Sequence, residues 1–322
     1  MSPPPNFPPN LRCAVILPCH NAAAAIAAVV ADFRTALPGA QVFVYDNAST
    51  DETTKVAFAA GAVVRQEPLK GKGHVIRRAL AEVEADIYLM ADGDGTYEAT
   101  AAPHMIAMLL REQLDMVTGV RRHKGKAAYR TGHQLGNRPF TEVFCRVFRM
   151  PMGDVLSGYQ VFSRRFVKTF PSVSRQFEIE IELSAHAAFM RLPVGEVETI
   201  YAERAEGSQS KLKTWRDGSY ILLKLVRFLS SYKPFLFFGS LSVLLTLTSF
   251  ALGVPVVVEF LETGLVPHFP TAILATGIMI AAVIFFAMSL TLDVLSRYHA
   301  ETKRLAYLRD SVLRSPEEQG NG

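Results

Sequence analysis

Short apolar runs alternate with amphipathic segments over the first 120 residues of the chain. Each apolar run covers five residues, and each amphipathic segment is long enough for two or more helical turns. Strands and helices that alternate in this way are typical of βαβ units, so the pattern predicts an α/β domain with a mostly parallel sheet. The expected strands are 13–17, 41–45, 62–66, 87–91 and 116–120, and the expected helices are 22–37, 51–60, 73–85 and 99–111.

Two later segments carry apolar and basic residues on opposite faces of a helix. In 137–150 the apolar face is rich in phenylalanine, and it either lies on a membrane surface or faces the protein core. In 219–231 the pattern leads directly into a long uncharged stretch, which favours the membrane surface. The first segment has Phe140, Val143, Phe144, Val147 and Phe148 opposite Arg138, Glu142, Arg146 and Arg149.

Two stretches without any charged residue follow, at 234–258 and 271–292. A helix rises about 1.5 Å per residue, so about 20 residues cross a hydrocarbon layer roughly 30 Å thick. Both stretches are long enough, and we expect transmembrane helices at about 234–258 and 270–293. Two buried core helices are the less favoured alternative, because uncharged runs of this length are read as membrane spans by default.

Basic residues flank both stretches, whereas the loop between them has neither lysine nor arginine. By the positive-inside rule, both ends of this helical pair face the cytoplasm. The Pro-rich segment 1–11 lacks the apolar core of a signal peptide, so we expect it to be disordered and cytoplasmic. The flanking basic residues are Lys224, Arg227 and Lys233 before the pair and Arg297, Lys303 and Arg304 after it.

These patterns divide the chain into five parts. The net charge of +4 is small, and no basic stripe is interleaved with stacking aromatic residues, so we expect no nucleic-acid binding. The three cysteines have no ligand spacing and are expected to be free thiols. The parts are the N-terminal segment 1–11, an α/β domain at 12–215, a juxtamembrane amphipathic helix at 216–233, the paired spans within 234–296 and a cytoplasmic tail at 297–322.

Polar loops accompany the first strands. Ligands of open α/β sheets collect outside the carboxyl ends of the strands, so these loops can build one pocket. Asp92 and Asp94 come one residue apart directly after an apolar run. Two such carboxylates suit Mg²⁺ or Mn²⁺ held against a phosphate-bearing substrate. The loops are Pro18–Asn21, Asp46–Asp51, Lys70–Gly73 and Asp92–Thr96.

Single residues of these loops have more than one interpretation. Asp51 is a good N-cap for its helix, whereas Asp46 ends a strand and could accept hydrogen bonds from a nucleobase or ribose. The glycines on either side of Lys72 could let backbone N–H groups approach a pyrophosphate, although a plain turn explains them as well. The eight histidines show no metal-ligand spacing, and none is assigned a catalytic role.

The order of the loop motifs resembles that of family 2 glycosyltransferases of the GT-A fold. The family pattern is P-x-x-N-E, D-D/N-x-S-x-D and D-x-D, and the chain has PCHNA, DNASTD and DGDGT at these places. The closer resemblance is to the branch that makes polyprenyl-phosphate sugars, including dolichol-phosphate mannose synthases, a subset of which has two C-terminal transmembrane helices. The later motifs of this branch stand here as Gly136-Asn137-Arg138, Asp154–Tyr159, Phe177–Glu182 and Ser210-Lys211-Leu212, so the resemblance covers about residues 12–217.

The resemblance implies a GT-A (Rossmann-like) domain that transfers a hexose, with inversion, from a UDP- or GDP-sugar to a polyprenyl phosphate, undecaprenyl or dolichyl. It also implies the cytoplasmic face of a cell membrane, the bacterial inner membrane in particular. A phosphomonoester acceptor is largely a dianion near neutral pH and needs no general base. The implied donor contacts are Pro18, Asn21, Asp46, Asp51, Lys72 and Asp92, with Mg²⁺ or Mn²⁺ on Asp92 and Asp94. The implied acceptor-phosphate cations are Arg121, Arg138, Lys211 and Lys213; the catalytic residues are Asp94, Arg121 and Arg138, with Glu180 a further candidate.

Two positions depart from the family pattern. Ala22 replaces a glutamate, and Thr96 stands where some members have a metal-binding glutamine. Two other functions stay open: transfer to a glycerolipid or ceramide hydroxyl, which needs a general base, and a membrane-anchored scaffold that binds nucleotide sugar without turnover. A processive polysaccharide synthase is disfavoured, because Trp215 does not lie in a Q-x-x-R-W sequence. Assembly of copies through the membrane helices is also left open.

Overall fold

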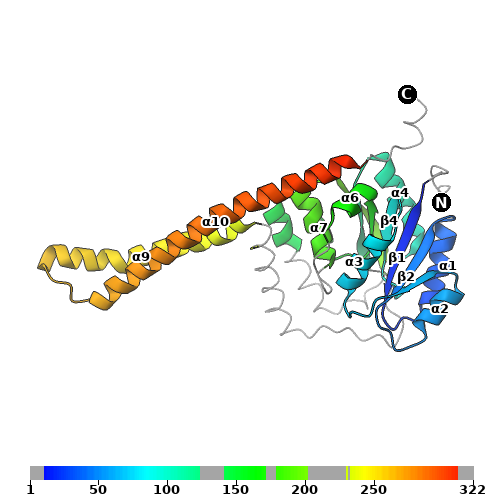
Figure 1. Ribbon diagram of the computed structural model, residues 1–322, viewed down its shortest axis with the longest axis horizontal. Helices are drawn as coiled ribbons and strands as arrows, with labels where there is room; N and C mark the ends of the chain where they lie inside the picture. The colour runs from blue at the N-terminus through cyan, green and yellow to red at the C-terminus, as the bar shows by residue number, and fades with distance from the viewer. Residues whose placement is uncertain (1–10, 124–140, 172–178, 202–229, 231–232, 311–322) are drawn as a thin grey trace, which may run out of the picture. The chain divides into compact units, whose positions relative to one another are not determined.

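The computed structural model describes residues 11–123, 141–171, 179–201, 230 and 233–310 of the chain (Figure 1). The chain divides into two compact units. The sheet unit consists of residues 1–212 together with 303–322, and the hairpin unit consists of residues 213–302. Residues from 303 onward, which lie within the expected cytoplasmic tail at 297–322, belong to the sheet unit.

One sheet of seven strands forms the centre of the sheet unit, in the order β3-β2-β1-β4-β6-β5-β7. Strand β6 runs antiparallel to both of its neighbours, and all the other neighbouring strands are parallel. This confirms the expected α/β architecture with a mostly parallel sheet. The strands are β1 (Cys13–Cys19), β2 (Gln41–Asp46), β3 (Val63–Gln66), β4 (Ile87–Met90), β5 (Met116–His123), β6 (Gln160–Ser163) and β7 (Val194–Tyr201).

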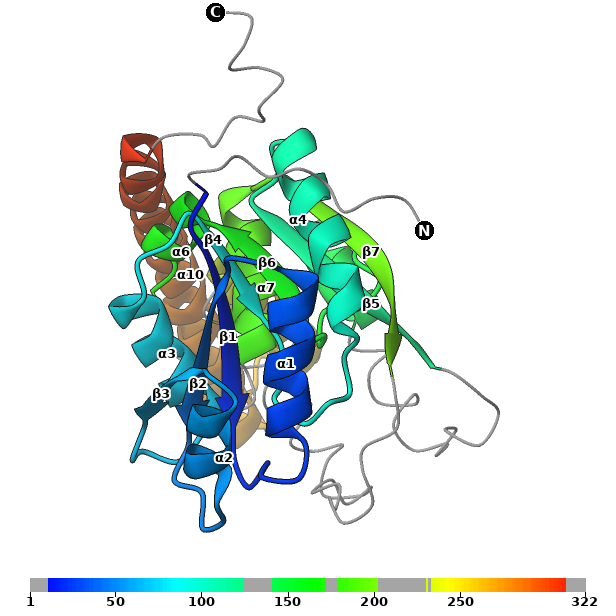
Figure 2. The ribbon, with the colours of Figure 1, turned by 90° about the vertical axis from the view of Figure 1, so that its right-hand side faces the viewer.

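Helices cover both faces of this sheet (Figure 2). Helices α1 and α4 lie on one face, and α3, α6 and α7 lie on the other. The helices are α1 (Ile26–Ala36), α2 (Thr53–Ala59), α3 (Lys72–Glu82), the 3₁₀ turn η1 (Ala99–Ala101), α4 (Ala102–Arg111), α6 (Arg164–Thr169) and α7 (Ile179–Met190). The alternation of these layers buries both sides of β1 and β4, which explains why these strands read as continuous apolar runs.

The pattern of apolar residues in α1 shows how a helix is fixed to the sheet. Ile26, Val29, Val30 and Phe33 recur at helical spacing, and all four are buried. They pack into one core cluster with strand residues such as Val15. Full burial of a side chain of this kind is worth about 1.5–3 kcal/mol, so this single face is enough to hold the helix on the sheet.

Three local expectations differ from the structure. The strands β6 and β7 were not predicted, because β6 is only four residues long and fully buried, and β7 carries alternate charges. Asp51 is not the N-cap of α2, a position taken by Glu52. Asp51 instead accepts hydrogen bonds from the backbone N–H and the hydroxyl of Thr53. The helix therefore begins two residues later than the sequence pattern indicates.

The phenylalanine stripe faces inward where the structure describes it. Residues 141–148 form a helix in which Phe144 is 1% exposed and stacks on Phe148 with ring centroids 4.7 Å apart. On the opposite face Glu142 and Arg146 are exposed. Of the two interpretations left open for this segment, the described part supports packing against protein. Arg138 and Phe140 lie outside the described residues.

Two long helices, α9 (Pro234–Thr263) and α10 (Phe269–Arg309), are long and apolar enough to cross a membrane. Only 17% of the apolar window of each is buried, whereas a core helix of a soluble protein is mostly buried. Small residues join them: the hydroxyls of Ser242 and Ser249 donate to backbone carbonyls of α10, each at 2.8 Å. The second expected span, 270–293, lies within α10, and the helix continues beyond it to Arg309.

His186 of α7 is a buried neutral histidine. It is 1% exposed, its ring packs edge-on against Phe166 and Phe170, and its Nε2 lies 3.1 Å from the Thr169 hydroxyl. Burial, helped by the positive charge of Lys303, lowers the pKa of His186 to about 3. A proton on this ring would place a charge among phenylalanine side chains, which disfavours the folded state.

We therefore expect acid to destabilise the protein through His186. Its contribution to the free energy of unfolding is complete above about pH 6.5. Below that pH the free energy of unfolding declines by up to about 1.4 kcal/mol per pH unit, because only the unfolded chain takes up the proton. Denaturant unfolding of the wild type and of His186→Leu measures this, and the variant should show the shallower pH dependence. His104→Leu changes an exposed histidine of α4 and is the control. Identical pH dependence in all three proteins would contradict the assignment.

Candidate active site

The four polar loops meet at one edge of the sheet, at the carboxyl ends of β1, β2 and β4. The N–H of Asn47 donates to the carbonyl of Cys19 at 2.8 Å, which joins the second loop to the first. The side-chain oxygen of Asn21 accepts from the N–H of Thr50 at 2.8 Å. The N–H of Gly93 donates to Pro18 at 3.4 Å, which adds the acidic loop. The structure thus brings together the loops that the sequence predicts to share a pocket.

Two aspartates of the second loop hold the cluster together. Asp46, 4% exposed, accepts hydrogen bonds from the hydroxyls of Ser49 and Thr54. Asp51 accepts from the N–H of Ala23, two residues after the first loop, as well as from Thr53. Burial opposes ionisation of Asp51, but these hydrogen bonds outweigh it and lower its pKa. Both side chains are therefore fixed carboxylates at the predicted donor-binding edge.

Asn47 uses its whole side chain to shape the neighbouring loop. Its amide nitrogen donates to the carbonyls of Glu67 at 3.1 Å and Leu69 at 2.7 Å, and its amide oxygen accepts from the N–H of Gly71 at 2.7 Å. Gly71 has φ +133°, a conformation that suits glycine. The next residue is Lys72, so Asn47 sets where α3 begins. This role of Asn47 was not expected, because its partners lie 20–24 residues away in the sequence.

Lys72 bridges two carboxylates from distant parts of the chain. Its Nζ lies 2.5 Å from Asp92 Oδ1 and 2.5 Å from Glu180 Oε1, and its side chain is 9% exposed. Burial alone would lower the pKa of Lys72, but the charges and hydrogen bonds of Asp92 and Glu180 raise it above its ordinary value. The bridge ties the acidic loop to α7. Glu180 is therefore a buried group of a helix, neither part of a strand nor on a solvated face.

Gly158 leaves the space that this bridge needs. A Cβ at this position would lie 2.8 Å from Asp92 Oδ2 and 3.1 Å from Lys72 Nζ. Its N–H donates to the hydroxyl of Tyr97 at 2.9 Å, which fixes the backbone there. Only a glycine permits the close approach, so the S-G-Y part of the later motif belongs to the same site.

Thr96 orients the second carboxylate of the acidic triplet. Its hydroxyl donates to Asp94 Oδ1 at 2.7 Å, its N–H donates to the same oxygen at 3.2 Å, and its side chain is fully buried. Gly95 between them has φ +76°, which favours glycine. Thr96 therefore acts on Asp94, in place of the metal-ligand role that a glutamine would have at this position.

The acidic edge offers few protein ligands to a metal. Within the described residues, no group of three or more histidine, cysteine, aspartate or glutamate side chains could hold a metal ion. Mg²⁺ commonly binds one or two carboxylates and completes its shell with waters and substrate phosphates. Asp92 and Asp94 fit that mode of binding. They do not form a cage that would hold a metal in the absence of a phosphate-bearing ligand.

Arg121, an expected acceptor-phosphate cation, is paired with a carboxylate. Its Nε and Nη2 donate to the two carboxylate oxygens of Asp154 at 2.6 and 2.9 Å, and its guanidinium lies 5.5 Å from the ring centroid of Tyr201. Burial opposes the charge, but Asp154 raises the pKa of Arg121. Asp154 is the first residue of the D-x-x-S-G-Y motif, so the motif could have indicated that this carboxylate has a partner at the site. Arg138, Lys211 and Lys213 lie outside the described residues.

Comparison with known proteins identifies the family. A model of "Glycosyl transferase family 2" matches residues 14–170. The glycosyltransferase AglJ of Haloferax volcanii is 32% identical over 302 residues, which cover 93% of this chain and 99% of AglJ. The chain belongs to glycosyl transferase family 2. This family 2 glycosyltransferase is also 55% identical to protein RfbJ of Shigella flexneri over 126 residues, 39% of this chain and 98% of RfbJ. The low-salt glycan biosynthesis hexosyltransferase Agl6 of Haloferax volcanii is 29% identical over 211 residues, 63% of this chain and 50% of Agl6.

Solved structures confirm the fold of this glycosyltransferase. The glucosyl-3-phosphoglycerate synthase of Mycobacterium tuberculosis, crystallised with Mn²⁺, UDP and glucosyl-3-phosphoglycerate, superposes with a TM-score of 0.56. The match covers 69% of this chain and 80% of the synthase, at 24% identity. The α/β sheet with one antiparallel strand is therefore of the GT-A type.

We expect Asn47→Asp to loosen the loop that Asn47 holds. A carboxylate cannot donate to the carbonyls of Glu67 and Leu69, and it places three acceptor oxygens together. Hydrogen exchange at residues 67–72 should accelerate by about tenfold or more, as for the loss of one or two buried hydrogen bonds. Gln66→Glu makes the same amide-to-acid change at an exposed neighbour and should have no such effect. Equal exchange in the two variants would show that Asn47 does not shape the loop.

Proposed function

We propose that this family 2 enzyme moves a hexose from a nucleotide diphosphate sugar to a polyprenyl phosphate at the cytoplasmic face of the cell membrane, with inversion at the anomeric carbon. One observation carries the proposal. The acidic edge around Lys72, Asp92 and Asp94, suited to a diphosphate and a divalent metal, occurs in one chain with two helices long and apolar enough to span a membrane. A nucleotide-sugar site and a means of reaching lipid thus belong to the same molecule.

The donor half of the proposal rests on the loop cluster. Asp46 and Asp51 are fixed carboxylates at one side of the cluster, where they can accept hydrogen bonds from the base and ribose. Asp92 and Asp94 would hold Mg²⁺ or Mn²⁺, and the synthase of the same fold was crystallised with Mn²⁺ and UDP. When bound, such a metal neutralises the charge that builds on the leaving diphosphate. Lys72 keeps Asp92 in position and adds a cation beside that diphosphate.

The acceptor half rests on Arg121. Asp154 occupies two of its five N–H groups, and within the described part of the chain the other three have no hydrogen-bond partner. The ion pair fixes the plane of the guanidinium, which leaves a preorganised fork for a phosphate. Arg138, Lys211 and Lys213 are proposed to add positive charge around the same phosphate. The attacking oxygen of the lipid phosphate is already ionised. The site therefore only has to position this oxygen and offset the repulsion between the lipid phosphate and the diphosphate of the donor.

Transfer to a glycerolipid or ceramide hydroxyl is the second candidate function. That reaction needs a general base within reach of the hydroxyl. Glu180 is paired with Lys72, and Asp154 is paired with Arg121, so both carboxylates already face a cation. A carboxylate whose oxygens are engaged by a cation is not free to contact an acceptor hydroxyl. The pairing therefore favours the phosphate acceptor.

The direct test is transfer by the purified full-length protein. It should convert undecaprenyl phosphate to a lipid-linked sugar with at least one common UDP- or GDP-hexose and Mg²⁺ or Mn²⁺, and should release the nucleoside diphosphate. Asp94→Asn should lower the rate by about 100-fold or more, because a ligand for the metal is lost. Asp32→Asn, at an exposed position of α1, should keep the wild-type rate. Transfer to diacylglycerol but not to the lipid phosphate would reject the proposed acceptor. Donor binding without turnover would support the scaffold instead.

Arg121→Lys separates the acceptor role from the donor role. Lysine keeps the charge but loses the fork, so the KM for the lipid phosphate should rise, or kcat should fall, by about tenfold or more, while UDP affinity is unchanged. Arg122→Lys alters the exposed neighbour that pairs with Glu198 and should be silent. A thermal unfolding measurement shows whether Arg121→Lys also loses stability because Asp154 is left poorly paired. Weakened UDP binding in Arg121→Lys would place this residue at the donor.

A further inference from the structure

The last turns of α10 belong to the sheet unit although the helix begins in the hairpin unit. Tyr307 shows why. It is 7% exposed, whereas its neighbours Leu305 and Leu308 are 63% and 64% exposed. The end of α10 therefore packs against the sheet unit through the Tyr307 side chain, whereas the leucines on either side of it are exposed. We call residues 303–310 the docking segment.

The receiving group is Asp115, which directly precedes β5. Its side chain is fully buried, and its Oδ2 accepts a hydrogen bond from the Tyr307 hydroxyl at 2.7 Å. The carboxylate also accepts from Arg165 at 2.5 and 3.1 Å and from the Ser163 hydroxyl at 2.6 Å. A buried carboxylate needs hydrogen-bond partners for its oxygens, and the tyrosine hydroxyl is one of the partners that satisfy Asp115.

Cation–π contacts strengthen the same attachment. The Arg165 guanidinium lies 4.7 Å from the ring centroid of Tyr307, and that of Arg304 lies 5.0 Å from it. The Nζ of Lys303 lies 5.8 Å from the ring centroid of Phe189 in α7. The tyrosine ring is thus held by its hydroxyl and by contacts with two guanidinium groups.

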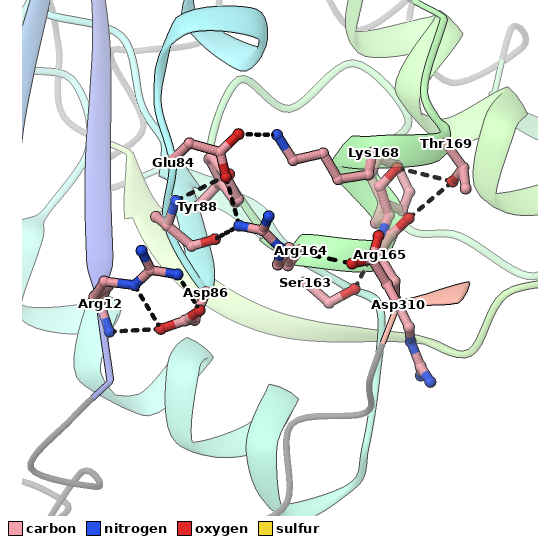
Figure 3. A network of polar contacts seen from close by, with 12 residues as sticks. Arg12, Glu84, Asp86, Tyr88, Ser163, Arg164, Arg165, Lys168, Thr169 and Asp310 are labelled. Atoms are coloured by element: carbon pink, nitrogen blue, oxygen red, sulfur yellow. Dashed lines mark hydrogen bonds and ion pairs between the residues drawn. The ribbon is translucent and has the colours of Figure 1, made fainter. Parts of the chain in front are cut away.

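An ion-pair network extends the attachment to the end of the docking segment (Figure 3). Arg164 of α6 lies between Glu84, at 2.6 Å, and Asp310, at 3.6 Å. Lys168, one turn further along α6, also reaches Glu84. The docking segment therefore meets α6, α7 and the residue before β5.

We propose that the docking segment fastens the end of α10 to the sheet unit at Asp115, so that the hairpin is joined to that unit at both of its ends. One join is the chain itself at residues 212–213, and the other is the contact between Tyr307 and Asp115. The docking does not depend on the proposed function.

Hydrogen exchange of the full-length protein in lipid nanodiscs tests the docking without any substrate. In Tyr307→Phe, amides of 303–309 and of 164–169 should exchange about tenfold faster than in the wild type, because a hydrogen bond to a buried charge is lost. Tyr298→Phe is the matched control, since Tyr298 is 69% exposed on the same helix, and it should exchange like the wild type. Unchanged exchange in Tyr307→Phe would overturn the proposal.

A double-variant cycle tests whether Tyr307 acts through Asp115. Asp115→Asn should accelerate exchange in the same two segments, and the double variant should show less than the product of the two single effects. If the acceleration in the double variant equals the product of the two single accelerations, the two residues act independently, which rejects the proposed contact. If Asp115→Asn does not fold, Tyr307→Phe against Tyr298→Phe decides alone. A wild-type protein without transferase activity, together with faster exchange in Tyr307→Phe, would count against the proposed function and leave the docking standing.

Discussion

The buried ammonium of Lys72 is the constraint on which the site depends. It lies between Asp92 and Glu180, so it joins the start of α3, the end of β4 and the start of α7. Removing one partner of a buried ion pair leaves an uncompensated charge, which costs about 3–5 kcal/mol. The loop shaped by Asn47, the glycine at position 158 and the packing of α7 all serve to keep this one cation and its carboxylates in place.

The same physical device recurs at both ends of β5. Asp115 precedes the strand and is paired with Arg165, whereas Arg121 lies near its other end and is paired with Asp154. In each case a guanidinium forks onto a carboxylate and contacts an aromatic ring. The pair at one end lies at the proposed acceptor site, and the pair at the other end contacts Tyr307 of α10. One strand therefore connects the site to the attachment of the helix.

Local patterns predict part of this arrangement well. The strands β1–β5 lie within two or three residues of their expected positions, because buried parallel strands are short apolar runs with polar loops after them. The acidic loop was found for the same reason. Strands β6 and β7 were missed, since β6 is only four residues long and β7 carries alternate charges. The start of α2 was misplaced because the helix begins at Thr53, whose N–H and hydroxyl donate to Asp51.

The sequence by itself determined the order of the loops, the two carboxylates one residue apart and the two uncharged helices, because each is a property of neighbouring residues. Only the tertiary structure decided which charges are paired. Lys72 and Glu180 are 108 residues apart, and Asp115 and Tyr307 are 192 apart, so no local pattern connects them. A buried charge is tolerated only beside its partner, and that partner is chosen by the way the strands and helices pack.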